Sequence, residues 1–265
     1  MSLLLPGMYV ATDSLLHRLD PRVKMGAALL LMVLPFSAQG WASYGMIAAF
    51  VGVLVFLAKA PLRALLGTLR TVVWVGLFMF VFYFFTTPGR PVFTIGSVSV
   101  TWEGLAAGGS QIFRLSLLVL IGSLLTYTTS PSQLSHGFEA MLSPLAKLGL
   151  PIRELAMVLT ISLRFVPTLA AEIDGITKAQ AARGAHIGSG NLWQRARGWP
   201  SLFVPVFVSA FRRADELAIA MEARGFRGAQ ARTRLTQLRL SRGDLIAVLV
   251  LLLVSAAVIG VDQLL

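Results

Sequence analysis

The chain has 265 residues, of which 56% are hydrophobic and only 13% are charged, with a mean hydropathy of +0.76. Soluble domains carry about 25% charged residues, so this composition excludes an ordinary water-soluble fold and predicts an integral membrane protein. The net charge of +11 is typical of basic cytoplasmic loops. The absence of cysteine excludes disulfides, thiol nucleophiles and thiolate metal sites.

Five apolar segments predict five transmembrane helices, at roughly Met25–Phe36, Tyr44–Leu57, Thr71–Thr87, Leu105–Tyr127 and Leu245–Val261. A helix needs about 20 apolar residues to cross the hydrocarbon core, so the first two segments are short. We expect these two to form a tight helical hairpin. Backbone groups in lipid must be hydrogen-bonded internally, which makes helix the expected structure for every span.

The basic residues are distributed unevenly between the connections. Of the 23 Lys and Arg residues, all but Arg90 and Arg114 precede the first span, separate the second from the third, or lie between the fourth and fifth. The positive-inside rule places those connections in the cytoplasm. We therefore expect a multi-pass membrane protein with a cytoplasmic N-terminus and an external C-terminus.

The long connection between the fourth and fifth spans is too polar to lie wholly in lipid and too apolar to be a linker. It predicts three helices: Ser132–Leu148 with a break near Pro144, Pro151–Arg183 with a kink near Pro167, and Ser201–Arg224. Gly184 and Gly225 follow the two long helices, where a glycine commonly ends a helix.

The expected fold class is therefore an all-α integral membrane protein with about five transmembrane helices and a cytoplasmic domain of about three helices inserted before the last span. The expected domains are a four-span membrane domain at 1–129, the cytoplasmic helical domain at 130–242 and the last span at 243–265. Arg114 is the charged residue expected inside a span, and we expect it to bond backbone carbonyls or Glu103 in a structural role. The glycine-rich stretch 104–110 predicts close helix packing. The aromatic run at 78–85 predicts a surface that faces lipid or a partner.

The two long cytoplasmic helices end alike. At an offset of 41 residues, two tripeptides match: Ala182, Arg183 and Gly184 align with Ala223, Arg224 and Gly225. Apolar positions before them also align in steps of three and four: Leu169, Ile173, Ile176 and Gln180 with Ala210, Ala214, Leu217 and Met221. Such steps lie on one helical face, so each face that should be buried ends in an arginine.

The chemistry of arginine suggests what these ends do. Its guanidinium stays charged and offers a rigid fork of donors that can pair bidentately with a carboxylate. Two similar ends predict two similar receivers, as a dimeric partner with one groove per subunit would provide. An alternative interpretation is that the arginines only oppose the helix dipole, which contributes a few tenths of a kcal/mol.

Several motifs resemble the T component of energy-coupling factor (ECF) transporters, and the resemblance covers nearly the whole chain: Asp13–Lys24, Thr101–Leu105, Thr128–Pro131, Leu163–Pro167, Ala179–Gly184 and Ala218–Phe226. The resemblance implies a non-catalytic scaffold in the bacterial inner membrane that serves vitamin or transition-metal uptake. It implies that Arg183 and Arg224 each enter a groove on one of two cytoplasmic ABC-type ATPase subunits. It also implies a separate membrane-embedded substrate-binding subunit, the S component.

We expect no catalytic residues, no metal site, no cofactor and no nucleic-acid partner. No Gly-Lys pair is present, so the chain lacks a P-loop, and its three histidines are far apart. One alternative function is a stand-alone secondary permease, but the expected spans contain no Asp or Glu to relay a coupling ion. Another is a basic membrane-anchored module that binds anionic lipid or ribosomal RNA, whose binding would fade steeply with salt.

Overall fold

The computed structural model describes residues 14–38, 40–95, 98–184, 192–226 and 241–264, so Asp13 of the first motif lies outside the described residues. The chain divides into two compact units. Unit 1 comprises Met1–Ala140 and Gln237–Leu265, and unit 2 comprises Met141–Thr236. The expected boundary between membrane and cytoplasm at residue 129 stays a prediction.

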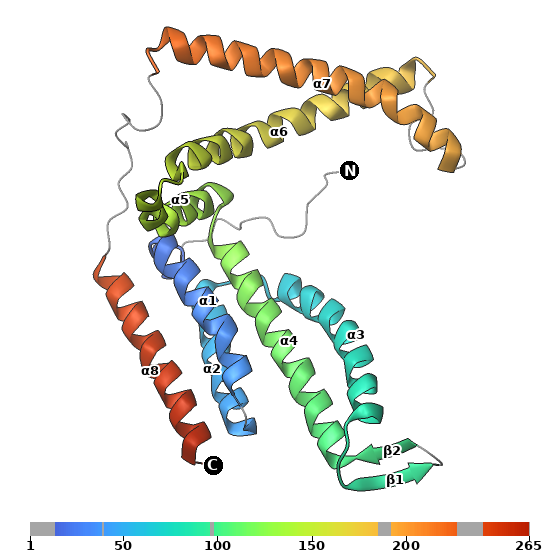
Figure 1. Ribbon diagram of the computed structural model, residues 1–265, viewed down its shortest axis with the longest axis vertical. Helices are drawn as coiled ribbons and strands as arrows, with labels where there is room; N and C mark the ends of the chain where they lie inside the picture. Colours follow the sequence, from blue (N-terminus) through green and yellow to red (C-terminus); the bar gives the residue numbers. More distant parts are fainter. Residues whose placement is uncertain (1–13, 39, 96–97, 185–191, 227–240, 265) are drawn as a thin grey trace. The chain divides into compact units, whose positions relative to one another are not determined.

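Unit 1 contains helices and one short hairpin (Figure 1): α1 (Pro21–Ser37), α2 (Trp41–Ala58), α3 (Leu62–Thr86), β1 (Pro91–Ile95), β2 (Val98–Thr101), α4 (Trp102–Thr128), α5 (Pro131–Leu142) and α8 (Arg242–Leu264). The end of α5 crosses the boundary between the units. The all-α fold class is confirmed. The antiparallel hairpin between α3 and α4 was not expected from the sequence, although its Val, Thr and Ile residues favour extended chain.

Five helices in the described part of the chain are long and apolar enough to cross a membrane: α2, α3, α4, α6 (Ile152–Ala182) and α8. The number of candidate spans agrees with the prediction, but the set differs. It includes α6 and leaves out α1, which covers the first predicted span. With 17 residues, α1 rises only about 26 Å, less than the thickness of the hydrocarbon core. Its inner face nevertheless packs into the core of unit 1, whereas α6 buries only Ile152 and Ala156.

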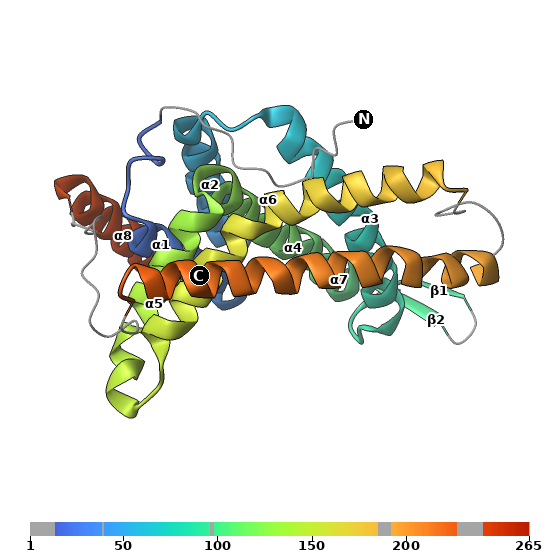
Figure 2. The ribbon, with the colours of Figure 1, turned by 90° about the horizontal axis from the view of Figure 1, so that it is seen from above.

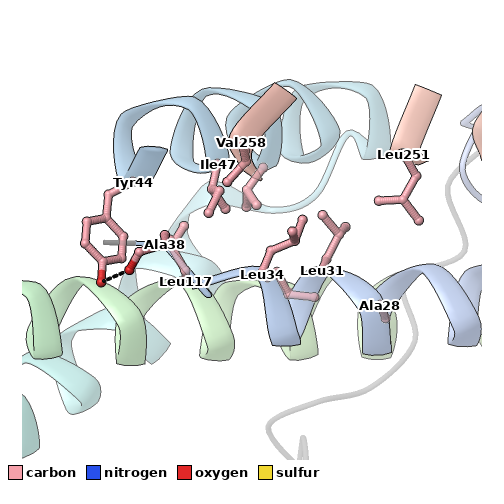
Figure 3. Packing of buried hydrophobic residues seen from close by; sticks show 11 residues of the cluster. Ala28, Leu31, Leu34, Ala38, Tyr44, Ile47, Leu117, Leu251 and Val258 are labelled. Carbon is pink, nitrogen blue, oxygen red and sulfur yellow. Dashed lines mark hydrogen bonds between the residues drawn. The ribbon is translucent and has the colours of Figure 1, made fainter. Parts of the chain in front are cut away.

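The core of unit 1 collects side chains from four helices (Figure 3): Ala28, Leu31 and Leu34 of α1, Tyr44, Ile47 and Val51 of α2, Leu117 and Ile121 of α4, and Leu251 and Val258 of α8. Lipid tails are as apolar as these side chains, so such a bundle is held by close packing and by internal hydrogen bonds. Close packing is most evident between α3 and α4. A Cβ added to Gly108 would lie 3.2 Å from the Cα of Phe80, which confirms the role predicted for this glycine-rich stretch.

Arg114 of α4 has the structural role expected of it. Its Nε donates to the Tyr44 hydroxyl at 2.6 Å, and its Nη2 donates to the Ala38 carbonyl at 3.2 Å. Glu103 instead accepts a hydrogen bond from the backbone N–H of Arg90 at 2.8 Å. Arg114 therefore ties α4 to the junction between α1 and α2.

Unit 2 contains the 3-10 helix η1 (Ser143–Leu148), α6 (Ile152–Ala182) and α7 (Leu192–Ala223). The break near Pro144 falls at the start of η1, as expected, and α6 continues through Pro167. The predicted start of the third helix at Ser201 is wrong, because α7 begins at Leu192 and continues through two prolines. Each proline costs one backbone hydrogen bond, which a long helix can tolerate.

Candidate functional site

The ends of α6 and α7 share one backbone geometry. At the end of α7, the N–H of Gly225 donates to the Glu222 carbonyl at 2.9 Å, and the N–H of Phe226 donates to the Met221 carbonyl at 3.0 Å. These two bonds define a Schellman motif. At the end of α6, the N–H of Gly184 donates to the Ala181 carbonyl at 3.0 Å, which is the equivalent of the first bond.

Glycine is required at both ends by the backbone angle rather than by packing. The φ angles are +82° at Gly184 and +71° at Gly225, and nothing lies within 4 Å of a Cβ built at either position. Residues with a side chain rarely adopt such angles. The glycines therefore stop each helix directly after its arginine and leave open space around the tip.

The side chains of Arg183 and Arg224 are exposed, and neither forms an ion pair with another described residue. The alanine before and the glycine after each arginine are exposed as well. Each helix of unit 2 thus presents a charged fork of donors flanked by small residues, and this combination suits a receiving groove that contains a carboxylate. Binding by these six residues stays a prediction, since no partner is present.

The two tips lie at opposite ends of one helix pair. Figures 1 and 2 show α7 running back along α6 in the antiparallel direction, and the two helices contact each other. Arg183 therefore lies at one end of the helix pair, and Arg224 lies at the opposite end. A dimeric partner with one groove per subunit would need this arrangement.

The apolar stripes that were predicted to be buried are only partly covered. In α6, Leu169, Ile176 and Gln180 are half-buried while Ile173 is exposed; in α7, Ala210, Leu217 and Met221 are half-buried while Ala214 is exposed. No side chain from Trp199 to Phe226 is fully buried. Much of the apolar surface of both helices is therefore exposed among the described residues.

A polar clasp joins the two helices where they cross. The carboxylate of Glu172 in α6 accepts a hydrogen bond from the Ser209 hydroxyl with one oxygen, and its other oxygen pairs with the Arg213 guanidinium of α7 at 3.1 Å. Sequence reasoning missed this contact. A signal was present, because Glu172 and Arg213 occupy equivalent positions at the offset of 41 and carry opposite charges.

Unit 1 contains a second polar group that sequence reasoning did not assign, around the Asp20–Lys24 part of the first motif. Lys24 is 7% exposed, and its ammonium donates to the carbonyls of His17 at 3.0 Å and Thr128 at 3.1 Å. Asp244 of α8 is 2% exposed and accepts from the Asp20 N–H at 2.8 Å. These bonds tie α1, α4 and α8 together, so this group is a structural anchor rather than a binding site.

The chain is similar to known transport proteins. Residues 12–235 match the family described as cobalt transport protein, CbiQ. The chain is 44% identical over 246 residues to the energy-coupling factor transporter transmembrane protein EcfT of Acidaminococcus fermentans, which covers 93% of this chain and 92% of that protein. It is 45% identical to the protein of that name from Thermosediminibacter oceani, over 91% of each chain, and 42% identical to the one from Bacillus subtilis, over 98% of each.

Proposed function

The chain belongs to the CbiQ family of cobalt transport proteins, and we propose that it couples two cytoplasmic ATPase subunits to a membrane-embedded S component that binds the substrate. The family predicted from the sequence motifs is thereby confirmed. The relatives and the five long apolar helices of the described residues also confirm a multi-pass transmembrane component of an ECF transporter. The ATPases, the S component and a vitamin or transition-metal substrate belong to the proposal.

The observation that carries the proposal is the pair of matching helix ends. Arg183 and Arg224 are exposed, each is followed by a glycine that ends its helix, and they lie at opposite ends of an antiparallel pair. A pair of related ATPase subunits offers two similar grooves, one for each tip. Within a groove, a guanidinium can form a bidentate, charge-assisted pair with a carboxylate.

The same geometry accounts for coupling. ATP binding closes a pair of ATPase subunits, and hydrolysis and product release open it. Helix tips held in the two grooves would follow this motion as rigid bodies. Because α6 and α7 are joined at their crossing, a displacement of the tips reaches the rest of unit 2 and changes how the S component lies in the membrane.

The exposed aromatic face of α7 supports a second, apolar partner. Trp199, Phe203, Phe207 and Phe211 follow one another at intervals of four residues, and neighbouring rings lie 5.2 to 6.4 Å apart. All four are exposed. A contiguous exposed aromatic patch of this kind marks a surface that binds a protein or lipid, and an S component embedded in the membrane would fit it.

The charge pattern supports the proposed orientation. α6 is apolar enough to span a membrane by composition, but it carries six charged residues from Arg153 to Lys178. Such residues are costly in hydrocarbon. We therefore propose that unit 2 lies on the cytoplasmic side of the bacterial inner membrane, where the basic connections and the N-terminus also lie.

The test is the double substitution Arg183→Ala with Arg224→Ala. Removing one partner of a hydrogen-bonded charge pair in an interface costs about 2–5 kcal/mol, so ATPase subunits should no longer co-purify and uptake should be lost. The protein should still insert in the membrane. The matched control is Arg212→Ala, which removes an exposed arginine from the middle of α7.

Uptake at the wild-type level in the double variant would refute the proposal. Salt separates it from the alternative of a basic module that binds anionic lipid or RNA. Phosphate contacts weaken steeply as salt rises, whereas helix tips held in a protein groove should remain bound.

A further inference from the structure

The clasp between α6 and α7 restricts the crossing of the two helices. Ser209 and Arg213 are four residues apart and therefore lie on one face of α7. They approach different oxygens of the Glu172 carboxylate, so that both ends of the group are held. The ion pair between Lys178 and Asp174, at 2.6 Å, lies within α6 and does not join it to α7.

The clasp also lies midway between the two tips. Arg183 follows Glu172 by eleven residues, and Arg224 follows Arg213 by eleven residues in the opposite direction. Each tip is therefore about 16 Å along its helix from the clasp. Glu172 and Arg213 are also equivalent positions at the offset of 41 residues.

Apolar packing leaves the angle between the helices weakly determined. α6 buries only Ile152 and Ala156, both far from the crossing, and α7 has no fully buried side chain from Trp199 onward. A directional polar contact is then the feature best able to set the angle. We propose that Glu172 is a positioning residue, which fixes the crossing of α6 and α7 so that Arg183 and Arg224 move as one body.

This inference rests on the proposed function only where it concerns transport, since the helix angle can be measured without a partner. The chain contains no cysteine, so spin labels can be attached at two introduced positions alone. Ala181→Cys and Glu222→Cys place exposed labels beside the two tips. Pulsed electron paramagnetic resonance on the full chain in lipid nanodiscs then gives the distribution of distances between the tips.

We expect a narrow distribution in the labelled protein and a broader one in Glu172→Gln, which keeps the size of the side chain but removes its charge and one of the two oxygens that accept from Ser209 and Arg213. The matched control is Asp174→Asn, which removes a carboxylate two residues away and leaves the crossing intact; its distribution should stay narrow. The exchanged pair Glu172→Arg with Arg213→Glu should narrow the distribution again. Uptake by the assembled transporter should fall about fivefold in Glu172→Gln, since the clasp is partly exposed.

An unchanged distribution in Glu172→Gln, or a control that broadens equally, would overturn the inference. Ser209→Ala gives an independent reading, because it removes the second donor without changing any charge. Wild-type uptake in Arg183→Ala with Arg224→Ala would refute the proposed function and would leave the distance measurement to decide on the clasp. A broadened distribution with normal uptake would show that the clasp sets the angle but plays no part in transport.

Discussion

Unit 1 and unit 2 are held together in different ways. In unit 1, α8 is anchored at both ends: Asp244 accepts from the Asp20 N–H, and Asp262 accepts from the Gly40 N–H at 3.1 Å and the Ser43 hydroxyl at 2.5 Å. A buried apolar cluster lies between these anchors. Unit 2 has two long helices with few buried side chains and a polar clasp at their crossing. Unit 1 is thus held by a buried core and buried hydrogen bonds, whereas unit 2 consists mainly of two long helices with exposed apolar surfaces.

The difference has a physical basis. A segment with few buried contacts changes its arrangement at low free-energy cost, which a part that transmits motion requires. A segment held by buried hydrogen bonds in lipid resists such change, because a broken bond leaves an unsatisfied polar group. This difference between the units would be contradicted if unit 1 tolerated the loss of an anchoring hydrogen bond. It would also be contradicted if unit 2 needed its exposed side chains for its own stability.

The largest effect is expected for Asp244→Ala. The substitution leaves the buried N–H of Asp20 without its acceptor and removes the partner of the Ser241 N–H, which should lower the free energy of unfolding by about 3 kcal/mol. Thermal unfolding of the purified protein in detergent measures the change. The control Asp215→Ala removes an exposed carboxylate from α7 and should stay within about 0.5 kcal/mol of the parent. Equal losses in the two variants would contradict the comparison.

A smaller effect, and one confined to unit 2, is expected for Gly225→Ala. Its φ of +71° costs an alanine about 1 kcal/mol, so the tip of α7 should be populated less often in its binding geometry. The affinity for the ATPase subunits, measured by titration with the purified subunits, should fall about fivefold. The unfolding temperature of unit 1 should stay unchanged. Gly225→Asn is the control, because asparagine tolerates this conformation better than other residues do. Alanine binding as tightly as glycine would mean that the tip geometry is irrelevant.

Much of this arrangement could be predicted from the sequence, for reasons that differ from element to element. Apolar runs and glycine stops are local signals, so the spans and both Ala-Arg-Gly helix ends could be located. The predicted start of the third helix at Ser201 is too late, because α7 begins at Leu192 and continues through Pro200 and Pro205. The clasp of Glu172 with Arg213 is a contact between residues 41 apart in the sequence, and hydrophobic periodicity does not predict such contacts. The choice between α1 and α6 as a span depends on packing, which composition does not report.

The smallest effect on stability, and the sharpest test of the comparison, is expected for Phe207→Ser. The Phe207 side chain is 58% exposed in the aromatic row of α7, so its loss should change the unfolding temperature hardly at all. If this face binds the S component, the same substitution should reduce the amount of S component that co-purifies, because an apolar anchor is lost from the interface. Phe113 of unit 1 packs against the buried core, and Phe113→Ser should give the reverse pattern, with lower stability throughout. A large loss of stability in Phe207→Ser would mean that the aromatic row holds unit 2 together. Unit 2 would then depend on its apolar side chains for stability in the way that unit 1 does.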